Sequence, residues 1–236
     1  MNKIEIIYKT LINAFGPQHW WPGETPFEIA VGAILTQNTN WGNVEKAIAN
    51  LKGARALGAK KVYRMPLARL AALIRPAGYC NVKTKRLRAF VSFLIENYQG
   101  SMEHMKKEDV HELRERFLTV HGIGPETADS ILLYALGKPI FVIDAYTRRV
   151  ISRHEVTNHD ESYADFQSLF HSSLKKDVVL FNEYHALLVN VGKLYCRPIP
   201  RCSACPLSPL LPSHGSKILG RQNVRNLRRK KQSVIE

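Results

Sequence analysis

The sequence predicts an all-α fold, and two observations support that prediction. Apolar residues recur at intervals of three and four through most of the 236 residues, which is the spacing of a helix that buries one face. No segment shows a convincing alternation of apolar and polar residues, the pattern of a half-buried strand. The chain is long enough for one large domain, or for two small domains that share a core.

Apolar stripes mark the helices in chain order, and short breaks rich in glycine and proline separate them. Since both residues interrupt helices, the pattern predicts about ten helices joined by short loops. The clearest stripes lie in residues 4–12, 27–35, 87–94 and 131–136, and the breaks fall at 16–17, 22–23, 75–78, 121–125, 138–139 and 198–200.

The chain is strongly basic, with 34 Lys and Arg against 20 Asp and Glu and a formal net charge of +14. Such an excess attracts polyanions, of which nucleic acid is the commonest in a cell. The longest apolar stretches are too short to cross a bilayer, and the first residues lack a signal-peptide pattern. We therefore expect a cytoplasmic protein (nucleoid-associated if bacterial) that binds nucleic acid and carries a mobile basic tail over residues 216–236.

The most specific local pattern is the turn Gly122-Ile123-Gly124, which lies between two helical stripes. Two glycines around an apolar residue let the chain turn tightly and expose backbone N–H groups. Pro125 suits the first turn of the following helix, because its missing N–H costs little there. Free N–H groups at a helix start bind phosphate, so the turn predicts a nucleic-acid contact, with Ile123 buried between the helices.

Further motifs lie before and after this turn. They are Leu35-Thr36-Gln37-Asn38-Thr39, Thr127-Ala128, Val142-Ile143-Asp144, Arg148-Arg149-Val150 and a cysteine cluster near the C-terminus. In this order and spacing they resemble the helix-hairpin-helix DNA glycosylases of the endonuclease III superfamily, over roughly residues 20–210. The resemblance implies a base-excision repair enzyme that flips a damaged base out of double-stranded DNA and hydrolyses its glycosidic bond.

The resemblance also implies a monomer of two helical lobes with a DNA-binding cleft between them. One lobe is expected to be a six-helix domain over residues 24–135 that contains the hairpin at 118–128. The other joins residues 1–23 to residues 136–215 and carries the cysteine loop. Asp144 and the hairpin are expected to face each other across the cleft.

Asp144 is implied to be the catalytic carboxylate, and the chemistry of the reaction agrees. Cleavage of an N-glycosidic bond builds positive charge on the sugar, which a nearby carboxylate stabilises while it orients or deprotonates the attacking water. An acid between an apolar run and a helix is also an ordinary N-cap. With the hairpin upstream of it, we favour catalysis.

Glu126 stands in the slot where bifunctional relatives carry a lysine nucleophile, directly after the hairpin. A carboxylate cannot form a Schiff base with the sugar, so the β-lyase step is expected to be absent. The resemblance therefore implies a monofunctional glycosylase that uses water. Glu126 itself is expected to be an ordinary acid in the first helical turn.

The tryptophans suggest which base is removed. The segment from Trp20 to Trp41 resembles the 3-methyladenine branch of the superfamily, in which such aromatic residues sandwich the flipped base. Methylated purines carry positive charge, so electron-rich rings would attract them. Packing in the core is the alternative for these rings. The predicted pocket consists of Trp20, Trp21, Pro22, Trp41 and Tyr146.

Two other function classes stay open. A mismatch uracil or thymine glycosylase also lacks the lysine nucleophile, and a non-catalytic relative would bind damaged DNA without cutting it. Asp144 favours an enzyme, because a pure binder gains little from a carboxylate aimed at a polyanion. An adenine-mismatch glycosylase is disfavoured, since Gly32 stands where such enzymes carry a glutamate.

Several residues are expected to contact DNA. By resemblance, Gln37 and its neighbour Asn38 would fill the gap left by the flipped base or contact the opposite strand. Basic residues near the loops are reasonable phosphate contacts, although each alone is also an ordinary surface charge. The motif residues predicted to contact DNA are Gly122, Ile123, Gly124, Thr127 and Arg148, and the further basic residues are Lys83, Lys85, Arg86, Arg149, Arg197 and Arg201.

Three cysteines near the C-terminus fall one short of an iron–sulfur motif. Relatives with a [4Fe–4S] cluster use four, whereas Cys196, Cys202 and Cys205 are followed by Leu211 at the fourth position. Three thiolates could still hold a cluster, with an open iron or with His214 as substitute. Alternatively, a Cys3His set could hold zinc, or the loop binds nothing. We favour no cluster and expect catalysis to need no metal.

Overall fold

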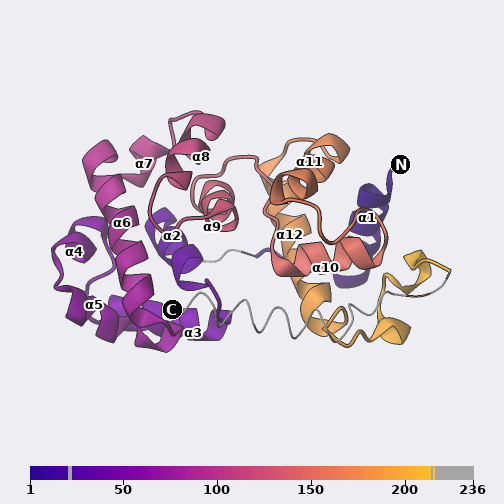
Figure 1. Ribbon diagram of the computed structural model, residues 1–236, viewed down its shortest axis with the longest axis horizontal. Helices are drawn as coiled ribbons and strands as arrows, with labels where there is room; N and C mark the ends of the chain where they lie inside the picture. Colours follow the sequence, from indigo (N-terminus) through magenta and orange to yellow (C-terminus); the bar gives the residue numbers. More distant parts are fainter. Residues whose placement is uncertain (21–22, 214, 216–236) are drawn as a thin grey trace. The chain divides into compact units, whose positions relative to one another are not determined.

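The computed structural model describes residues 1–20, 23–213 and 215 of the chain. Every regular element among these residues is a helix, as the ribbon in Figure 1 shows, so the predicted all-α class is confirmed. The chain forms two compact units. Of the described residues, a first unit contains Met1–Gln18, Ile143–Lys175 and those from Glu183 to residue 215, and a second unit contains those of His19–Val142 and Lys176–Asn182.

The helices of the second unit follow one another closely, and several of them begin with a polar residue that caps the helix. Thr25 caps α2 and Asn40 caps α3, because their side chains accept hydrogen bonds from backbone N–H groups that the helix leaves unpaired. The elements are α2 (Pro26–Leu35), α3 (Trp41–Gly53), α4 (Ala59–Arg64), α5 (Leu67–Leu73), a 3-10 turn η1 (Arg75–Ala77), α6 (Cys80–Tyr98), α7 (Met102–Met105), α8 (Val110–Leu118), α9 (Pro125–Ser130) and a π-helix η2 (Ile131–Ala135).

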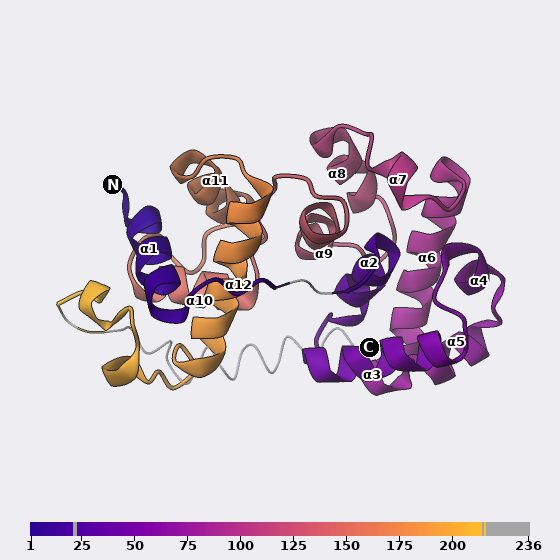
Figure 2. The same ribbon diagram turned by 180° about the vertical axis from the view of Figure 1, so that it is seen from behind.

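The centre of the second unit is α6, which Figures 1 and 2 show as a long upright helix. The apolar stripe predicted at residues 87–94 is buried, and α2, α4, α5 and α7 pack against this helix. Full burial of each such side chain contributes about 1.5–3 kcal/mol. The helix therefore serves as the support for the loops described below.

The stripe at residues 131–136 adopts a π-helix rather than the α-helix that its spacing predicts. The Leu136 N–H donates to the Ile131 carbonyl at 3.1 Å, one residue further back than in an α-helix. All five residues of η2 are buried, and η2 packs against α2. A π-turn widens the helix, and such turns occur frequently at functional sites.

The first unit is formed from the two ends of the chain. Tyr184, which is buried, joins them by donating its hydroxyl hydrogen bond to the Ile4 carbonyl at 2.8 Å. None of the helices in the described residues combines the length and hydrophobicity that a membrane span requires. The elements are α1 (Lys3–Phe15), α10 (Ala145–Arg153), α11 (Tyr163–Ser173), α12 (Val178–Leu194, its first residues counted with the second unit) and the 3-10 turns η3 (Cys202–Ala204) and η4 (Ser208–Leu210).

Candidate active site and DNA-binding hairpin

The Gly122-Ile123-Gly124 turn joins α8 to α9. Gly122 has a φ of 80°, a left-handed conformation that strains residues with a Cβ. A side chain there would also collide with Arg86, whose Cγ lies 2.2 Å from the position a Cβ would take. Ile123 is buried, and Gly124 precedes α9 without any side-chain cap. The turn before α9 therefore depends on two features, the backbone of its two glycines and the buried side chain of Ile123.

An ion pair ties the two hairpin helices together. Asp129 on α9 is fully buried, and Arg114 on α8 donates from Nε to Oδ1 at 2.7 Å and from Nη2 to Oδ2 at 3.1 Å. A two-pronged arginine–carboxylate pair fixes geometry as well as adding energy. The pair therefore sets how α8 and α9 cross on either side of the turn.

The Gln37 side chain is held inside the second unit by three hydrogen bonds. Its Nε2 donates to the Gly122 carbonyl at 3.0 Å and to the Thr127 hydroxyl at 2.9 Å, while its Oε1 accepts from Arg86 Nη1 at 2.6 Å. Thr127 is buried, so its hydroxyl faces Gln37. The loop after α2 is thereby fastened to the hairpin. Asn38 is exposed and has a φ of 56°.

The expectation that Lys83 contacts phosphate is wrong. Lys83 is buried on α6, and its Nζ donates to the carbonyls of Leu35 at 2.8 Å and Ala77 at 2.7 Å. Burial, together with the charge of Arg86, lowers the pKa of Lys83 to about 8. Lys83 satisfies the carbonyl groups left at the end of α2 and in η1, so it holds the loop that carries Gln37.

Two tryptophans predicted to line the base pocket pack against different neighbours in the second unit. Trp41, half-buried at the start of α3, lies so close to Gly32 that a Cβ there would be 3.1 Å from the indole ring. Trp20, also half-buried, meets Tyr134 of η2 edge-on at 5.3 Å between ring centroids. Even alanine at position 32 would require the indole of Trp41 to shift by a few tenths of an ångström. Trp21 and Pro22 lie outside the described residues.

Asp144 is the N-cap of α10, with an exposed side-chain fraction of 14%. Its Oδ1 accepts a hydrogen bond from the Thr147 N–H at 2.7 Å. The other oxygen, Oδ2, lies 3.8 Å from Nε2 of His185, a buried residue of α12. Asp144 is therefore an N-cap that uses one carboxylate oxygen and leaves the second outside the cap.

Tyr146 packs against α12 at the closest approach of two helices in the first unit. A Cβ on Gly192 would lie 2.5 Å from Cδ1 of the Tyr146 ring, so only glycine allows this contact. The guanidinium of Arg149 lies over the same ring at 5.1 Å and donates from Nε to the Cys196 carbonyl at 2.5 Å. Arg149 therefore has a packing role that the sequence did not reveal.

Arg148, predicted to contact DNA, is half-buried. Its guanidinium lies 4.6 Å from the centre of the Phe166 ring and donates to the Glu161 carbonyl at 2.8 Å. These contacts fasten α10 to α11 and to the loop before it. Glu126 is exposed in the first turn of α9, where a negative charge is favourable.

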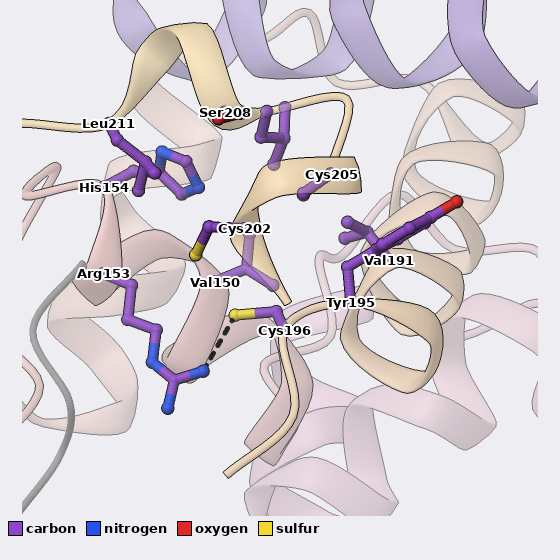
Figure 3. Close-up of a pocket in the computed structure, with 11 residues that line it drawn as sticks. Val150, Arg153, His154, Val191, Tyr195, Cys196, Cys202, Cys205, Ser208 and Leu211 are labelled. Atoms are coloured by element: carbon purple, nitrogen blue, oxygen red, sulfur yellow. Dashed lines mark hydrogen bonds between the residues drawn. The ribbon is translucent and has the colours of Figure 1, made fainter. Parts of the chain in front are cut away.

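The three C-terminal cysteines line a small cavity of the first unit (Figure 3), with a volume of about 10 Å³. Arg153 of α10 is buried there and donates from Nη1 to Cys196 Sγ at 3.3 Å and from Nη2 to the Pro198 carbonyl at 2.9 Å. Figure 3 shows this guanidinium reaching toward Cys196. Burial raises the pKa of the Cys205 thiol.

The arrangement of this loop does not fit a [4Fe–4S] cluster. A cavity of about 10 Å³ has room for about one water molecule, and a guanidinium N–H points at the sulfur that would bind iron. Leu211 lines the cavity at the fourth position of the motif. In the part of the chain that the structure describes, no three His, Cys, Asp or Glu side chains are placed to hold a metal ion, and His214 lies outside that part.

Two residues near Asp144 were missed from the sequence. Gly192 gives a weak signal, because a glycine inside an apolar helix destabilises it and is often present where another segment packs closely against the backbone. His185 gives none, since a histidine in a helix is ordinary until its neighbour is known. Their roles depend on packing between α10 and α12, which no local pattern encodes.

Comparisons with known proteins agree with this architecture. Residues 31–176 match the family model described as HhH-GPD superfamily base excision DNA repair protein. A candidate DNA repair glycosylase of Methanocaldococcus jannaschii is 47% identical over 211 residues, which cover 87% of this chain and 96% of that protein. The 3-methyladenine DNA glycosylase MagIII of H. pylori, bound to 1,N6-ethenoadenine, has a TM-score of 0.68 and 29% identity, covering 82% of this chain and 98% of MagIII.

An endonuclease III in a non-covalent complex with DNA has a TM-score of 0.76 at 21% identity, covering 97% of this chain and 100% of its own. That likeness confirms the predicted fold. The family match includes the loop after α2, the hairpin and Asp144. The chain therefore belongs to the HhH-GPD superfamily of base excision DNA repair proteins, and it is a DNA glycosylase of the endonuclease III type.

Proposed function

We propose that this chain is a monofunctional glycosylase that removes an alkylated purine such as 3-methyladenine from double-stranded DNA. The observation that carries the proposal is the Asp144 carboxylate, which is ordered by the cap of α10 and keeps one oxygen outside that cap. Such a carboxylate can stabilise positive charge on the sugar and accept a proton from water. Asp144 thus supplies the carboxylate that hydrolysis of the glycosidic bond requires.

The aromatic residues of the second unit support an alkylated purine. Gly32 leaves the space that the Trp41 indole occupies, and Trp20 is steadied by Tyr134. Rings held in this way can stack on a flipped base and attract the positive charge of a methylated purine. MagIII, which is similar over most of this chain, is a 3-methyladenine DNA glycosylase. Tyr146, Trp21 and Pro22 are further residues proposed to contact the flipped base.

The substrate is tested by comparing release of free base from two kinds of duplex DNA. Methylated DNA is expected to release 3-methyladenine, whereas DNA with a uracil or thymine opposite guanine is expected to release little. Release from the mismatched duplex alone would replace the alkylpurine proposal with the mismatch alternative. Tight binding without release from either would indicate a non-catalytic damage-binding protein.

We expect no lyase activity, because Glu126 stands in the slot of the lysine nucleophile and a carboxylate cannot form a Schiff base. The native protein should give no covalent complex with DNA when borohydride is added during the reaction. Abasic strands should remain uncut until alkali is added. A trapped complex or direct strand cleavage would contradict this prediction and point to another amine as the nucleophile.

The hairpin and Asn38 are the proposed DNA contacts. The start of α9 at Gly124 has no side-chain cap, which suits a phosphate oxygen. Ile123 and Thr127 are buried, so they shape the hairpin from within, and Arg148 would contribute charge from the first unit. Asn38 rather than Gln37 is the residue proposed to fill the gap left by the flipped base, because it is exposed.

The two amides of this loop should therefore respond differently to truncation. Asn38→Ala is expected to weaken binding to damaged duplex by about tenfold or more, since the cost of unstacking the base is then less well offset. Gln37→Ala should instead lower the free energy of unfolding by about 1 kcal/mol, because partly buried hydrogen-bonding groups lose their partner. Equal losses of binding with unchanged stability in both variants would refute this division.

We infer that the cysteine loop is held by Arg153 and needs no cluster for catalysis. Protein purified without oxygen should lack the visible absorbance of an iron–sulfur cluster, and EDTA should leave its melting temperature unchanged. The guanidinium of Arg153 already satisfies carbonyl groups of the loop. Four iron atoms per chain with matching sulfide would contradict this inference.

A further inference from the structure

His185 occupies a position beside the proposed catalytic carboxylate that no sequence motif marks. Its side chain is 5% exposed, and its Nε2 lies 3.8 Å from Oδ2 of Asp144. Oδ1 of the same carboxylate accepts the Thr147 N–H at 2.7 Å. The two oxygens of Asp144 therefore face two different groups, a backbone donor of its own helix and an imidazole of α12.

The spacing between these groups is set by backbone packing. Gly192 lies two helical turns after His185, on the same face of α12, and the Tyr146 ring of α10 rests directly on it. Because a Cβ at position 192 would push Tyr146 away, the glycine keeps the start of α10 close to α12. Arg149 covers the Tyr146 ring and donates to the Gly192 carbonyl at 3.3 Å. His185 is thus held beside Asp144 by a close-packed contact.

The surroundings of His185 favour the neutral imidazole over the charged form. Burial lowers the pKa of His185, and the nearby carboxylate of Asp144 opposes that effect. A neutral imidazole with its hydrogen on Nε2 presents a donor to Oδ2. A separation of 3.8 Å is too long for a hydrogen bond in the unbound protein. Catalytic hydrogen bonds commonly shorten when substrate binds, so a small rotation of either side chain would close this one.

We propose that His185 is a positioning residue that orients the Asp144 carboxylate for base removal. The proposal rests on the proposed function, in which Asp144 is catalytic. Once the second contact has closed, a carboxylate held at both oxygens cannot rotate, so its plane is fixed relative to the sugar. A buried donor that faces an ionised carboxylate also offsets part of the free energy that the carboxylate loses when it is removed from water. His185 acts only through Asp144 and does not touch the reacting sugar.

The test compares single-turnover base release from methylated duplex DNA by His185→Phe, His185→Gln and Asp144→Asn. His185→Phe keeps a planar ring and removes the donor, so release should slow by at least about tenfold, or about 1.4 kcal/mol in the barrier. His185→Gln, whose amide nitrogen can replace Nε2, should recover most of the rate. Affinity for duplex DNA should stay within about twofold in both variants, since neither changes the expected DNA contacts.

A double variant separates positioning from a general structural role. In the Asp144→Asn background, adding His185→Phe should cause no further loss, because the imidazole then has no carboxylate to orient. His154→Phe, which removes another buried histidine of the first unit, should leave the rate unchanged. A rate for His185→Phe equal to that of the native protein, or a further loss in the double variant, would overturn the proposal.

The same series keeps the two proposals distinct. If the native protein releases no base from methylated duplex, the proposed function fails. If Asp144→Asn releases base as fast as the native protein, the catalytic role of Asp144 fails, and the positioning role of His185 fails with it. If Asp144→Asn is inactive while His185→Phe is fully active, only the positioning role fails. Circular dichroism will show whether His185→Phe folds. If it does not, the rate of His185→Gln relative to the native protein decides, and a loss greater than tenfold in that variant would overturn the positioning role.

Discussion

Asp144→Asn is expected to slow base release by about 100-fold to 10,000-fold, the range lost when a positioned acid–base group is removed. Its thermal stability should stay close to that of the native protein. Asparagine is as good an N-cap as aspartate, so its side-chain oxygen can still accept the Thr147 N–H. The substitution therefore removes the charge that is proposed to stabilise the sugar, while it keeps the structural contact.

Asp144→Ala is the control that separates the two roles. Alanine removes the cap as well as the charge, so this variant should lose about 1 kcal/mol of stability in addition to its activity. Rates and melting temperatures measured side by side distinguish the outcomes. Loss of activity in Asp144→Ala alone, with Asp144→Asn fully active, would make Asp144 only a helix cap.

Arg114→Met is expected to lower the free energy of unfolding by about 3–5 kcal/mol, because it leaves the buried carboxylate of Asp129 without its guanidinium. This pair joins α8 to α9, so the loss should appear in the hairpin. Urea denaturation of native and variant protein measures it. Binding to undamaged duplex DNA should weaken in parallel, since the hairpin is the proposed phosphate contact.

The double variant Arg114→Met, Asp129→Asn tests the reason for that loss. Once the buried charge is removed, much of the lost stability should return, because an uncharged buried group costs less than an unpaired ion. A double variant that is destabilised by the sum of the two single effects would mean that the pair is not the origin of the loss.

The fold could be predicted from the sequence because helices that bury one face have a local signature. The stripe that includes Leu87 and Leu94 lies on the buried side of α6, and the breaks at Gly16 and Gly122 are turns with positive φ. The hairpin was predictable for the same reason, since glycine conformation and an apolar plug are local properties. Asp144 was predictable as a cap from its position alone.

What could not be predicted depends on contacts between distant parts of the chain. Lys83 was expected at the surface because lysine is seldom buried, yet two carbonyl groups compensate its burial. The hydrogen bonds of Gln37 to Gly122 and Thr127, which join the loop after α2 to the hairpin, could not be predicted either. The contact of His185 with Asp144 required the packing of α10 against α12. Each of these follows from the tertiary structure and leaves no local signature.

The measurement that tests the central proposal most directly is chromatography of the bases released from methylated duplex DNA by the native protein and by Asp144→Asn, with strand cleavage followed in parallel. We predict that the native protein releases 3-methyladenine without cutting the strand and that the variant releases almost none. Equal release by both proteins would contradict the role of Asp144. Release accompanied by strand cleavage without alkali would contradict the monofunctional mechanism.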